Sequence, residues 1–274
     1  MKFAVVEGAR REAEPGLIGQ CPACGAPVIA KCGERKIRVW HWAHRAAYSC
    51  DPWREGETDW HRTWKNYFPD EWQEFIHSDG GEKHVADVKT QSGLVIEFQH
   101  SFLPQGKRLA RETFYRNMIW VVDGRKRKRD RAQFSAALKA ADVASLKPPV
   151  FAVSFPSEVA LLRDWLESRV PVYFDFGDSE EGDALQFATP ILWRLDPIRR
   201  DGKAYLTTVM KAGFLHVHLE GPFEKGCSES VAGAVASWLA RRDAPPPVRL
   251  PQFERFGARQ QRARAWGPWG RWGR

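Results

Sequence analysis

The chain has 274 residues, a length that accommodates about two domains at roughly 150 residues each. Hydrophobic residues make up 43% and charged residues 28%, with 13 Trp and 16 Phe, a balance that excludes disorder over most of the length. No apolar stretch approaches roughly 18 residues, and residues 1–11 lack the apolar core of a secretory signal. We therefore expect a cytoplasmic protein with no membrane partner.

Two basic segments dominate the formal charge of +8. Residues 125–131 carry six basic side chains against one Asp, and residues 249–274 carry seven Arg against one Glu, which leaves the rest at −3. Charge at defined places favours a polyanion such as DNA, although basic runs also serve solubility. The tail, residues 245–274, contains three Trp as well, which suits base stacking, a protein partner or a tail without function.

A pair of cysteines begins the part of the chain that is rich in reactive side chains. Cys21 and Cys24 are followed by a glycine, the spacing with which two thiolates hold one tetrahedral zinc. Residues 28–30 and 36–40 predict a hairpin that returns later ligands to this pair. The four expected ligands are Cys21, Cys24, His44 and Cys50, with His41 as the alternative and Cys32 less favoured. Four protein ligands close a site, so we expect a structural Zn²⁺.

A helix is predicted from about residue 57 to residue 68. At 100° per residue its apolar stripe contains Trp60, Trp64 and Phe68. Its outward face contains Asp59, Arg62 and Asn66. Glu57 and His61 fall inside the apolar stripe, where an acid and a His are costly unless they pair or bind a metal. Both are therefore candidate site residues, and the alternative is a buried Glu57–His61 pair at positions i and i+4.

Two strand-like segments, residues 84–90 and 94–100, flank a three-residue turn. In that register Asp87 lies opposite Glu97, and strand alternation places Gln99 on the same face. A two-residue turn would shift the register by one and separate the pair. The sequence thus predicts two adjacent carboxylates beside an amide.

A second helix is predicted from Pro104 to Arg116, followed by a strand over residues 118–122. One side of this helix presents Arg108, Arg111 and Tyr115. Arg and Tyr at this spacing suit phosphate contact and packing against a nucleotide, and a surface Arg stacked on Tyr gives the same pattern.

The later residues predict elements without a site motif. A β-α-β unit that extends the sheet by a right-handed crossover is predicted over residues 150–176. Further strands are predicted at residues 191–195, 204–209 and 214–219, and a helix at residues 228–241.

This order of helix, hairpin, helix and strand resembles the core of the PD-(D/E)xK nucleases, and more closely the competence protein CoiA family and its CoiA-like relatives. The matching motifs, which span residues 15–124, are CPAC from Cys21, HWAH from His41, ETDWH from Glu57, VADV from Val85, VIEFQHS from Val95, and Arg111 through Tyr115 with the Trp120 strand.

The resemblance implies an α/β fold with a restriction-endonuclease-like core, in which a mixed sheet is flanked by helices. It places a zinc-finger-like module at residues 1–52 and the core at residues 53–176. An α+β extension at residues 177–244 and the basic tail at residues 245–274 follow. The implied activity is hydrolysis of DNA phosphodiester bonds with Mg²⁺ or Mn²⁺, in transformation, recombination or defence.

Carried over by position, the resemblance implies that Asp87 and Glu97 hold Mg²⁺ and that Glu57 is a further acidic ligand or orients water. Arg111 and Tyr115 would support DNA, single- or double-stranded. Gln99 stands where many such nucleases have Lys; it can orient water but brings no charge. A noncatalytic DNA-binding adaptor is therefore the alternative, and a zinc-stabilised protein-interaction module a more distant one.

Overall fold

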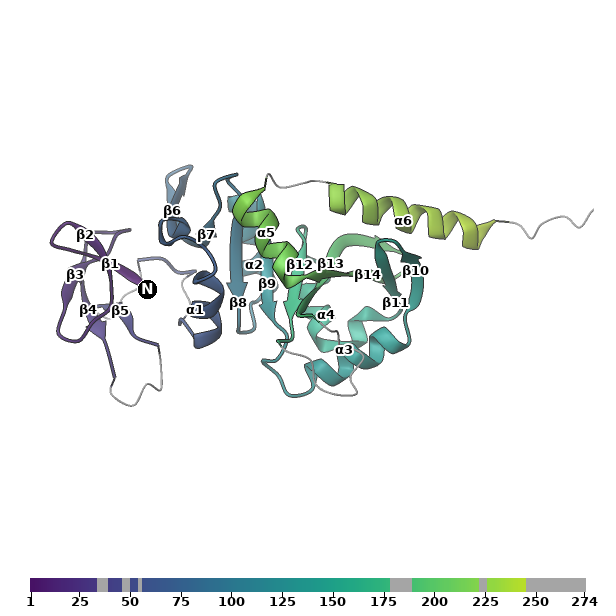
Figure 1. The fold of residues 1–274 in the computed structure, drawn as a ribbon, viewed down its shortest axis with the longest axis horizontal. Helices are drawn as coiled ribbons and strands as arrows, with labels where there is room; N and C mark the ends of the chain where they lie inside the picture. The colour runs from purple at the N-terminus through teal and green to yellow at the C-terminus, as the bar shows by residue number, and fades with distance from the viewer. Residues whose placement is uncertain (34–38, 46–49, 54–55, 178–188, 222–225, 245–274) are drawn as a thin grey trace, which may run out of the picture.

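The computed structural model describes residues 1–33, 39–45, 50–53, 56–177, 189–221 and 226–244. The tail, residues 245–274, lies outside the described residues, and so does its expected contact with DNA or a protein. The described residues form a small sheet at one end of the elongated molecule and a large sheet in its body (Figure 1). No described helix is both long and apolar enough to span a membrane.

The small sheet has the strand order β2-β1-β3-β4-β5. Its strands are β1 (Phe3–Val6), β2 (Ala9–Glu12), β3 (Ile18–Gln20), β4 (Pro27–Lys31) and β5 (His41–His44). The expected hairpin differs in its second strand: residues 39 and 40 precede β5, which begins at His41, and Lys31 pairs with His41. Residues 34–38 lie outside the described part of the chain.

The large sheet has nine strands in the order β10-β11-β14-β13-β12-β9-β8-β7-β6. Its strands are β6 (Gln73–Asp79), β7 (Glu82–Lys89), β8 (Val95–Gln99), β9 (Met118–Asp123), β10 (Asp142–Leu146), β11 (Pro149–Val153), β12 (Val172–Asp175), β13 (Ile191–Arg200) and β14 (Lys203–Met210). β8, β9 and β12 run parallel to one another, and the other pairs are antiparallel. The expected α/β class with a mixed sheet is confirmed.

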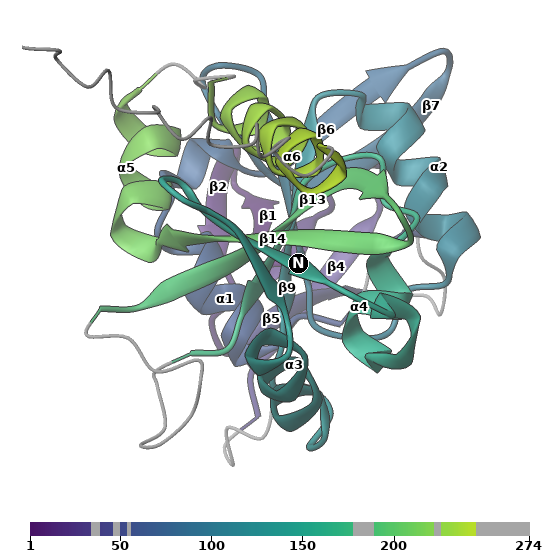
Figure 2. The same cartoon turned by 90° about the vertical axis from the view of Figure 1, so that its right-hand side faces the viewer.

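Helices cover both faces of the large sheet. The α-helices are α1 (Asp59–Lys65), α2 (Gln105–Tyr115), α3 (Asp130–Lys139), α4 (Ala160–Trp165), α5 (Lys211–Glu220) and α6 (Gly226–Asp243). Apolar side chains of α2, α3 and α4 join the core on one face, and those of α1 and α5 join the core on the other. α6 packs over β10, β11 and β13 (Figure 2). Both β8 and β9 are buried on both faces; β9 is accordingly almost continuously apolar, whereas β8 carries the polar residues Glu97 and Gln99.

The second half of the sheet departs from the predicted topology. β11 and β12 belong to one sheet, but β14 and β13 lie between them and make them antiparallel, so the predicted crossover unit is wrong. Residues 214–219 form part of α5 and not a strand. Since β13 and β14 continue the sheet, it extends past residue 176, where we expected the core to end.

Candidate functional site

A cluster of three cysteines and one histidine lies at the edge of the small sheet. The ligand atoms of Cys21, Cys24, His44 and Cys50 all lie within 4.8 Å of one another. The Sγ atoms of Cys21 and Cys50 are 3.7 Å apart, and a tetrahedral zinc with bonds of about 2.3 Å requires about 3.8 Å. These are the four predicted side chains, and the cluster could hold a structural metal such as zinc.

The electrostatics of the cluster also suit a cation. Burial and the neighbouring Cys21 thiol raise the pKa of Cys50 to about 12, because ionised thiols so close together repel. A divalent ion removes this penalty and favours the thiolates. The alternative ligand His41 is absent from the cluster, and its Nδ1 lies 2.8 Å from the carbonyl oxygen of Val39. Cys32 also lies outside the cluster.

The β7–β8 hairpin has the predicted register. Val88 pairs with Ile96 and Lys89 with Val95, which makes Asp87 the residue opposite Glu97. At that point the two strands are joined by bonds from backbone amides to side-chain carboxylates instead of backbone–backbone bonds. The amide of Asp87 donates to Glu97 Oε1 at 3.2 Å, and the amide of Phe98 donates to Asp87 Oδ2 at 3.0 Å. These bonds fix both carboxylates beside the point where the strands separate.

A small cavity of about 50 Å³ lies beside these carboxylates. The predicted site residues that line it are Glu57, His61, Asp87, Glu97, Gln99 and Arg111. They come from α1, the segment before it, β7, β8 and α2. Residues that are 54 positions apart in the sequence, Glu57 and Arg111, thus meet at one place. The space is large enough for a few water molecules or a hydrated ion.

Glu97 is the most perturbed acid of the cavity. Its side chain is 7% exposed and accepts from Arg111 Nη1 at 3.2 Å. Burial and then the charge of Asp87 raise its pKa to about 8, and Arg111 opposes this shift only in part. The carboxylates of Asp87 and Glu97 therefore lie close together, and Arg111 compensates their negative charge only in part. A bound cation would relieve this repulsion.

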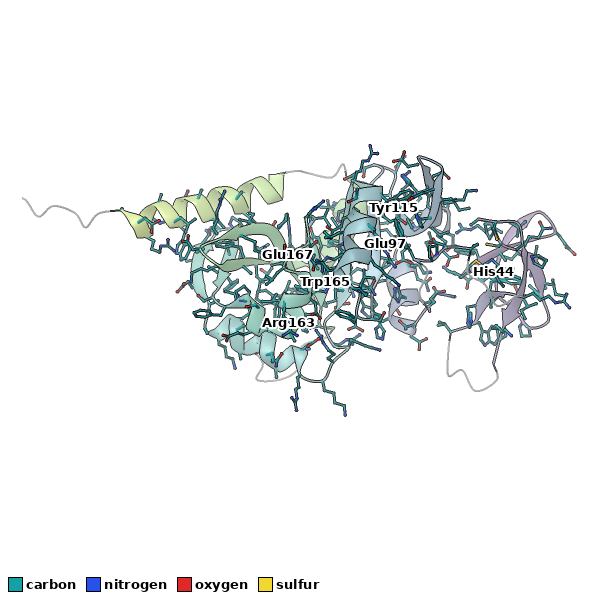
Figure 3. All side chains as sticks on the ribbon, turned by 180° about the vertical axis from the view of Figure 1, so that it is seen from behind. His44, Glu97, Tyr115, Arg163, Trp165 and Glu167 are labelled. Atoms are coloured by element: carbon teal, nitrogen blue, oxygen red, sulfur yellow. The ribbon has the colours of Figure 1, made fainter. Side chains whose placement is uncertain are left out.

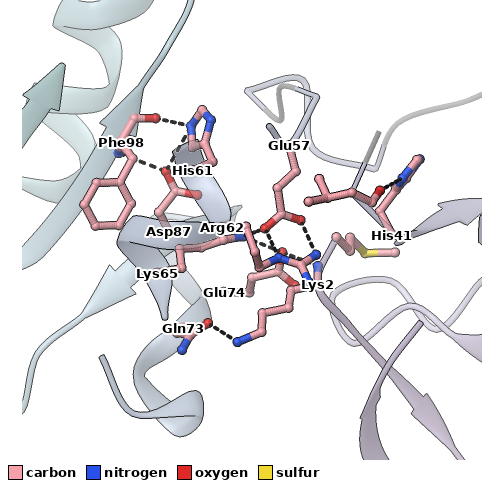
Figure 4. Close-up of polar contacts among 12 residues, drawn as sticks. Lys2, His41, Glu57, His61, Arg62, Lys65, Gln73, Glu74, Asp87 and Phe98 are labelled. Carbon is pink, nitrogen blue, oxygen red and sulfur yellow. Dashed lines mark hydrogen bonds and ion pairs between the residues drawn. The ribbon is translucent and has the colours of Figure 1, made fainter. Parts of the chain in front are cut away.

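His61 connects α1 to the carboxylates (Figure 4). Its Nε2 donates to the carbonyl oxygen of Phe98 and lies 4.0 Å from Asp87 Oδ2. The hydrogen on His61 Nε2 is thus bonded to the backbone of β8, and His61 holds α1 against the carboxyl end of this strand. The alternative pairing of His61 with Glu57 is not formed, because Glu57 has two cationic partners.

Those partners are Arg62 and Lys65, whose nitrogens lie 2.9 and 2.7 Å from Glu57 Oε1. Burial raises the pKa of Glu57, but the two cations outweigh it and lower the pKa to about 2. Lys65 also binds Glu74 at 3.2 Å. Arg62, expected on the outward face, is only 14% exposed because it also contacts Glu12 of the small sheet at 3.2 Å.

Lys65 and Glu74 are cavity residues that the sequence reasoning missed. The side chain of Lys65 is 3% exposed. A signal was present, since Lys65 lies four residues from His61 on the inner face of the same helix. Glu74 has a positive φ of 46° and accepts from the amides of Lys2 and Phe3. It therefore joins the cavity to the small sheet.

Arg108 and Tyr115 do not have the surface position that DNA contact requires. Arg108 is 1% exposed and donates to the carbonyl oxygen of Asp164, and Tyr115 is 5% exposed and packs against Trp53 and Phe114. The expected DNA-facing side of α2 is the side that faces the sheet. Among the three predicted residues of this helix, Arg111 reaches the cavity.

The segment after Cys50 joins the cysteine cluster to the cavity. Asp51 is 2% exposed and binds His84 Nδ1 at 2.9 Å and the Val85 amide at 2.8 Å, both on β7. Trp53 stacks on His84 with ring centroids 3.3 Å apart, and its carbonyl accepts from Arg111. Figure 3 shows His44 of the small sheet well apart from Glu97 along the molecule, so this segment spans the distance between the two places.

The comparisons with known proteins give a match over the cysteine cluster and none over the cavity. No curated protein and no solved structure matches the chain. Residues 20–52 match the family model described as "Competence protein CoiA, N-terminal domain". This segment contains the whole cysteine cluster and none of the residues that line the cavity. The chain is therefore similar to the N-terminal domain of competence protein CoiA over the residues that build the cluster.

Proposed function

We propose that this protein is a CoiA-like, metal-dependent nuclease that hydrolyses DNA phosphodiester bonds in DNA processing related to competence. The match over residues 20–52 supports the link to competence. The observation that carries the nuclease assignment is the Asp87–Glu97 pair on one cavity with Gln99 and Arg111. The PD-(D/E)xK assignment of the large sheet belongs to the same proposal.

The donor atoms of the cavity fit a hard divalent cation. Asp87 and Glu97 offer carboxylate oxygens, which Mg²⁺ and Mn²⁺ prefer, and the raised pKa of Glu97 indicates uncompensated negative charge. These two residues would hold the ion. When bound, such an ion lowers the pKa of a coordinated water and polarises the scissile phosphate.

The remaining side chains position the substrate and the water. Gln99 is fixed at the cavity by bonds from its Nε2 to the carbonyl oxygen and the Oγ of Ser101, at 2.9 and 3.3 Å. Held in this way, its amide orients the attacking water. Arg111 and Lys65 place positive charge on the cavity wall, where it stabilises the negative charge that develops on the phosphate. Glu57 acts by anchoring Lys65.

The cysteine cluster holds a structural Zn²⁺ in this proposal. Its core is small, and small modules depend on a metal for stability. Because Trp53 is only three residues after Cys50, a bound zinc would fix the segment that carries the Trp53 carbonyl, which accepts from Arg111. The zinc therefore acts on the arrangement of the cavity and takes no part in the chemistry.

Two observations favour the alternative of a noncatalytic DNA-binding adaptor. Gln99 brings no charge, and Glu97 is already paired with Arg111. The test measures binding and cleavage of labelled DNA by the same preparation, without divalent metal and with Mg²⁺ or Mn²⁺. Cleavage only with metal supports the nuclease; tight, salt-sensitive binding without cleavage under any condition supports the adaptor.

A further inference from the structure

A second cavity, of about 150 Å³, lies at the carboxyl ends of β8 and β9, beside α3 and α4. Its walls are mostly apolar and include Leu103, Val122, Leu161 and Trp165. Its polar lining includes His100, Ser101, Lys126 and Arg127. Ligands of open α/β sheets bind outside the carboxyl ends of the strands, and apart from Ser101, which holds Gln99, none of these residues takes part in the proposed cleavage.

The two cavities are neighbours along one strand. Gln99 lines the first cavity, and the next two residues, His100 and Ser101, line the second. The bonds from Gln99 Nε2 to Ser101 tie the two rims together. At about 3.3 Å per residue, Gln99 and Ser101 are about 7 Å apart along the chain. A DNA strand whose scissile phosphate lies at Asp87 and Glu97 can therefore place an adjoining nucleotide at the second cavity.

The charge of this rim suits a polyanion. The basic segment 125–131 begins directly after β9, and Lys126 Nζ lies 3.2 Å from His100 Nε2. The acidic lining residues are each paired. Asp123 binds His100 at 2.8 Å, and Asp130 and Asp164 bind Arg127 at 2.8 and 2.9 Å. The lining itself carries three Asp against Lys126 and Arg127, and the excess positive charge lies in the adjoining segment 125–131, which has six basic side chains against one Asp.

The second cavity also has an exposed aromatic side chain at its edge. Phe102 is 67% exposed and lines the cavity. A basic edge combined with an exposed aromatic ring is the composition by which proteins hold single strands, since every base has a π-face that stacks on such a ring. The cavity is smaller than the roughly 300 Å³ of pockets for drug-sized ligands, so it suits one ring system.

We propose that this cavity is a subsite for one unpaired base of the DNA strand, which makes single-stranded DNA the preferred substrate. This inference rests on the proposed function, which makes DNA the ligand, and it adds a preference for single-stranded over double-stranded DNA. A base within a duplex already stacks on both neighbours and cannot enter the cavity unless it is extruded. An unpaired base stacks on Phe102, and its phosphates lie along Lys126 and the basic segment.

The test is the affinity for one labelled oligonucleotide as a single strand and as a duplex, measured by fluorescence anisotropy without divalent metal, so that nothing is cut. The intact protein should bind the single strand at least about tenfold more tightly. Phe102→Ala should weaken single-strand binding by about 5- to 100-fold and leave duplex binding unchanged. Phe155→Ala, at a ring that is 72% exposed elsewhere, is the matched control.

A second pair of variants addresses the charge. Lys126→Ala should reduce the slope of log affinity against log salt concentration by about one. Lys139→Ala, at the far end of α3, should leave this slope unchanged. Equal affinity for the two forms of DNA, or Phe102→Ala with unchanged single-strand binding, overturns the proposal. Absence of cleavage with metal overturns only the proposed nuclease, because the binding experiment does not depend on cleavage.

Discussion

Arg111 Nη1 lies 3.2 Å from Glu97 Oε2, and both side chains are buried. This ion pair joins α2 to β8 beside a carboxylate pair whose negative charge it compensates only in part. The pKa of Glu97 therefore stays at about 8 although a guanidinium touches it. Several properties of the protein depend on this incomplete compensation.

Stability without metal should depend on the ionisation of Glu97. Its pKa rises from 4.5 to about 8 on folding, so the folded chain binds more protons than the unfolded chain between these values. The free energy of unfolding should fall as pH rises through this window, by up to about 1.4 kcal/mol per pH unit. In Glu97→Gln the side chain cannot ionise, so the free energy of unfolding should not show this decrease with pH. Urea denaturation between about pH 5 and pH 8 measures it, and equal pH dependence in both proteins would contradict the expectation.

Arg111→Met should move the pH dependence of cleavage to higher pH. Arg111 lowers the pKa of Glu97, so its removal raises that pKa further and leaves less of the ionised, metal-binding form near neutral pH. Arg116→Met is the control, because Arg116 is 79% exposed and pairs with Asp79 on the surface. A pH–rate profile for the three proteins tests this, and an unshifted profile in Arg111→Met counts against metal binding by Glu97.

Cys24→Ser should abolish stoichiometric zinc, because it removes one of the four ligand atoms of the cluster. Cys32→Ser should retain the metal, since Cys32 lies outside the cluster. Metal analysis of the purified proteins gives the answer directly. If both variants kept zinc, or if the unaltered protein contained none, the assignment of the cluster would be wrong.

Lys65→Met should destabilise the fold strongly. Lys65 is buried and binds two carboxylates, those of Glu57 and Glu74. Removal of one partner from a buried ion cluster costs about 3–5 kcal/mol. Lys139→Met, on the exposed end of α3, should change stability by no more than about 0.5 kcal/mol. Chemical denaturation of both variants is the measurement, and similar stabilities would show that Lys65 is not part of the structural framework.

The sequence predicted the carboxylate pair because its geometry is local. A three-residue turn and a strand period of two are enough to place Asp87 opposite Glu97 and Gln99 on the same face. The cysteine ligands were likewise predictable, since the spacing of Cys21 and Cys24 has few structural alternatives.

Long-range packing accounts for the errors. Helical periodicity shows which residues share a face of a helix, but not which face packs against the sheet. In α2 the buried face is the one that carries Arg108. Arg62 is covered because the small sheet packs against α1, a contact that no local pattern reveals. Residues 214–219 alternate like a strand, yet they form a helix in which Phe214 and His218, four positions apart, pack together with ring centroids 4.4 Å apart.

The most direct test of the central claim is the rate at which Asp87→Asn cleaves labelled DNA with Mg²⁺ or Mn²⁺. The substitution keeps the size of the side chain and removes the charge that would hold the ion. The control is Asp79→Asn, at a surface carboxylate that is 46% exposed. We predict metal-dependent cleavage by the unaltered protein and by Asp79→Asn, and a loss of at least about 100-fold in Asp87→Asn. Equal rates in all three proteins would contradict a nuclease site at Asp87 and Glu97.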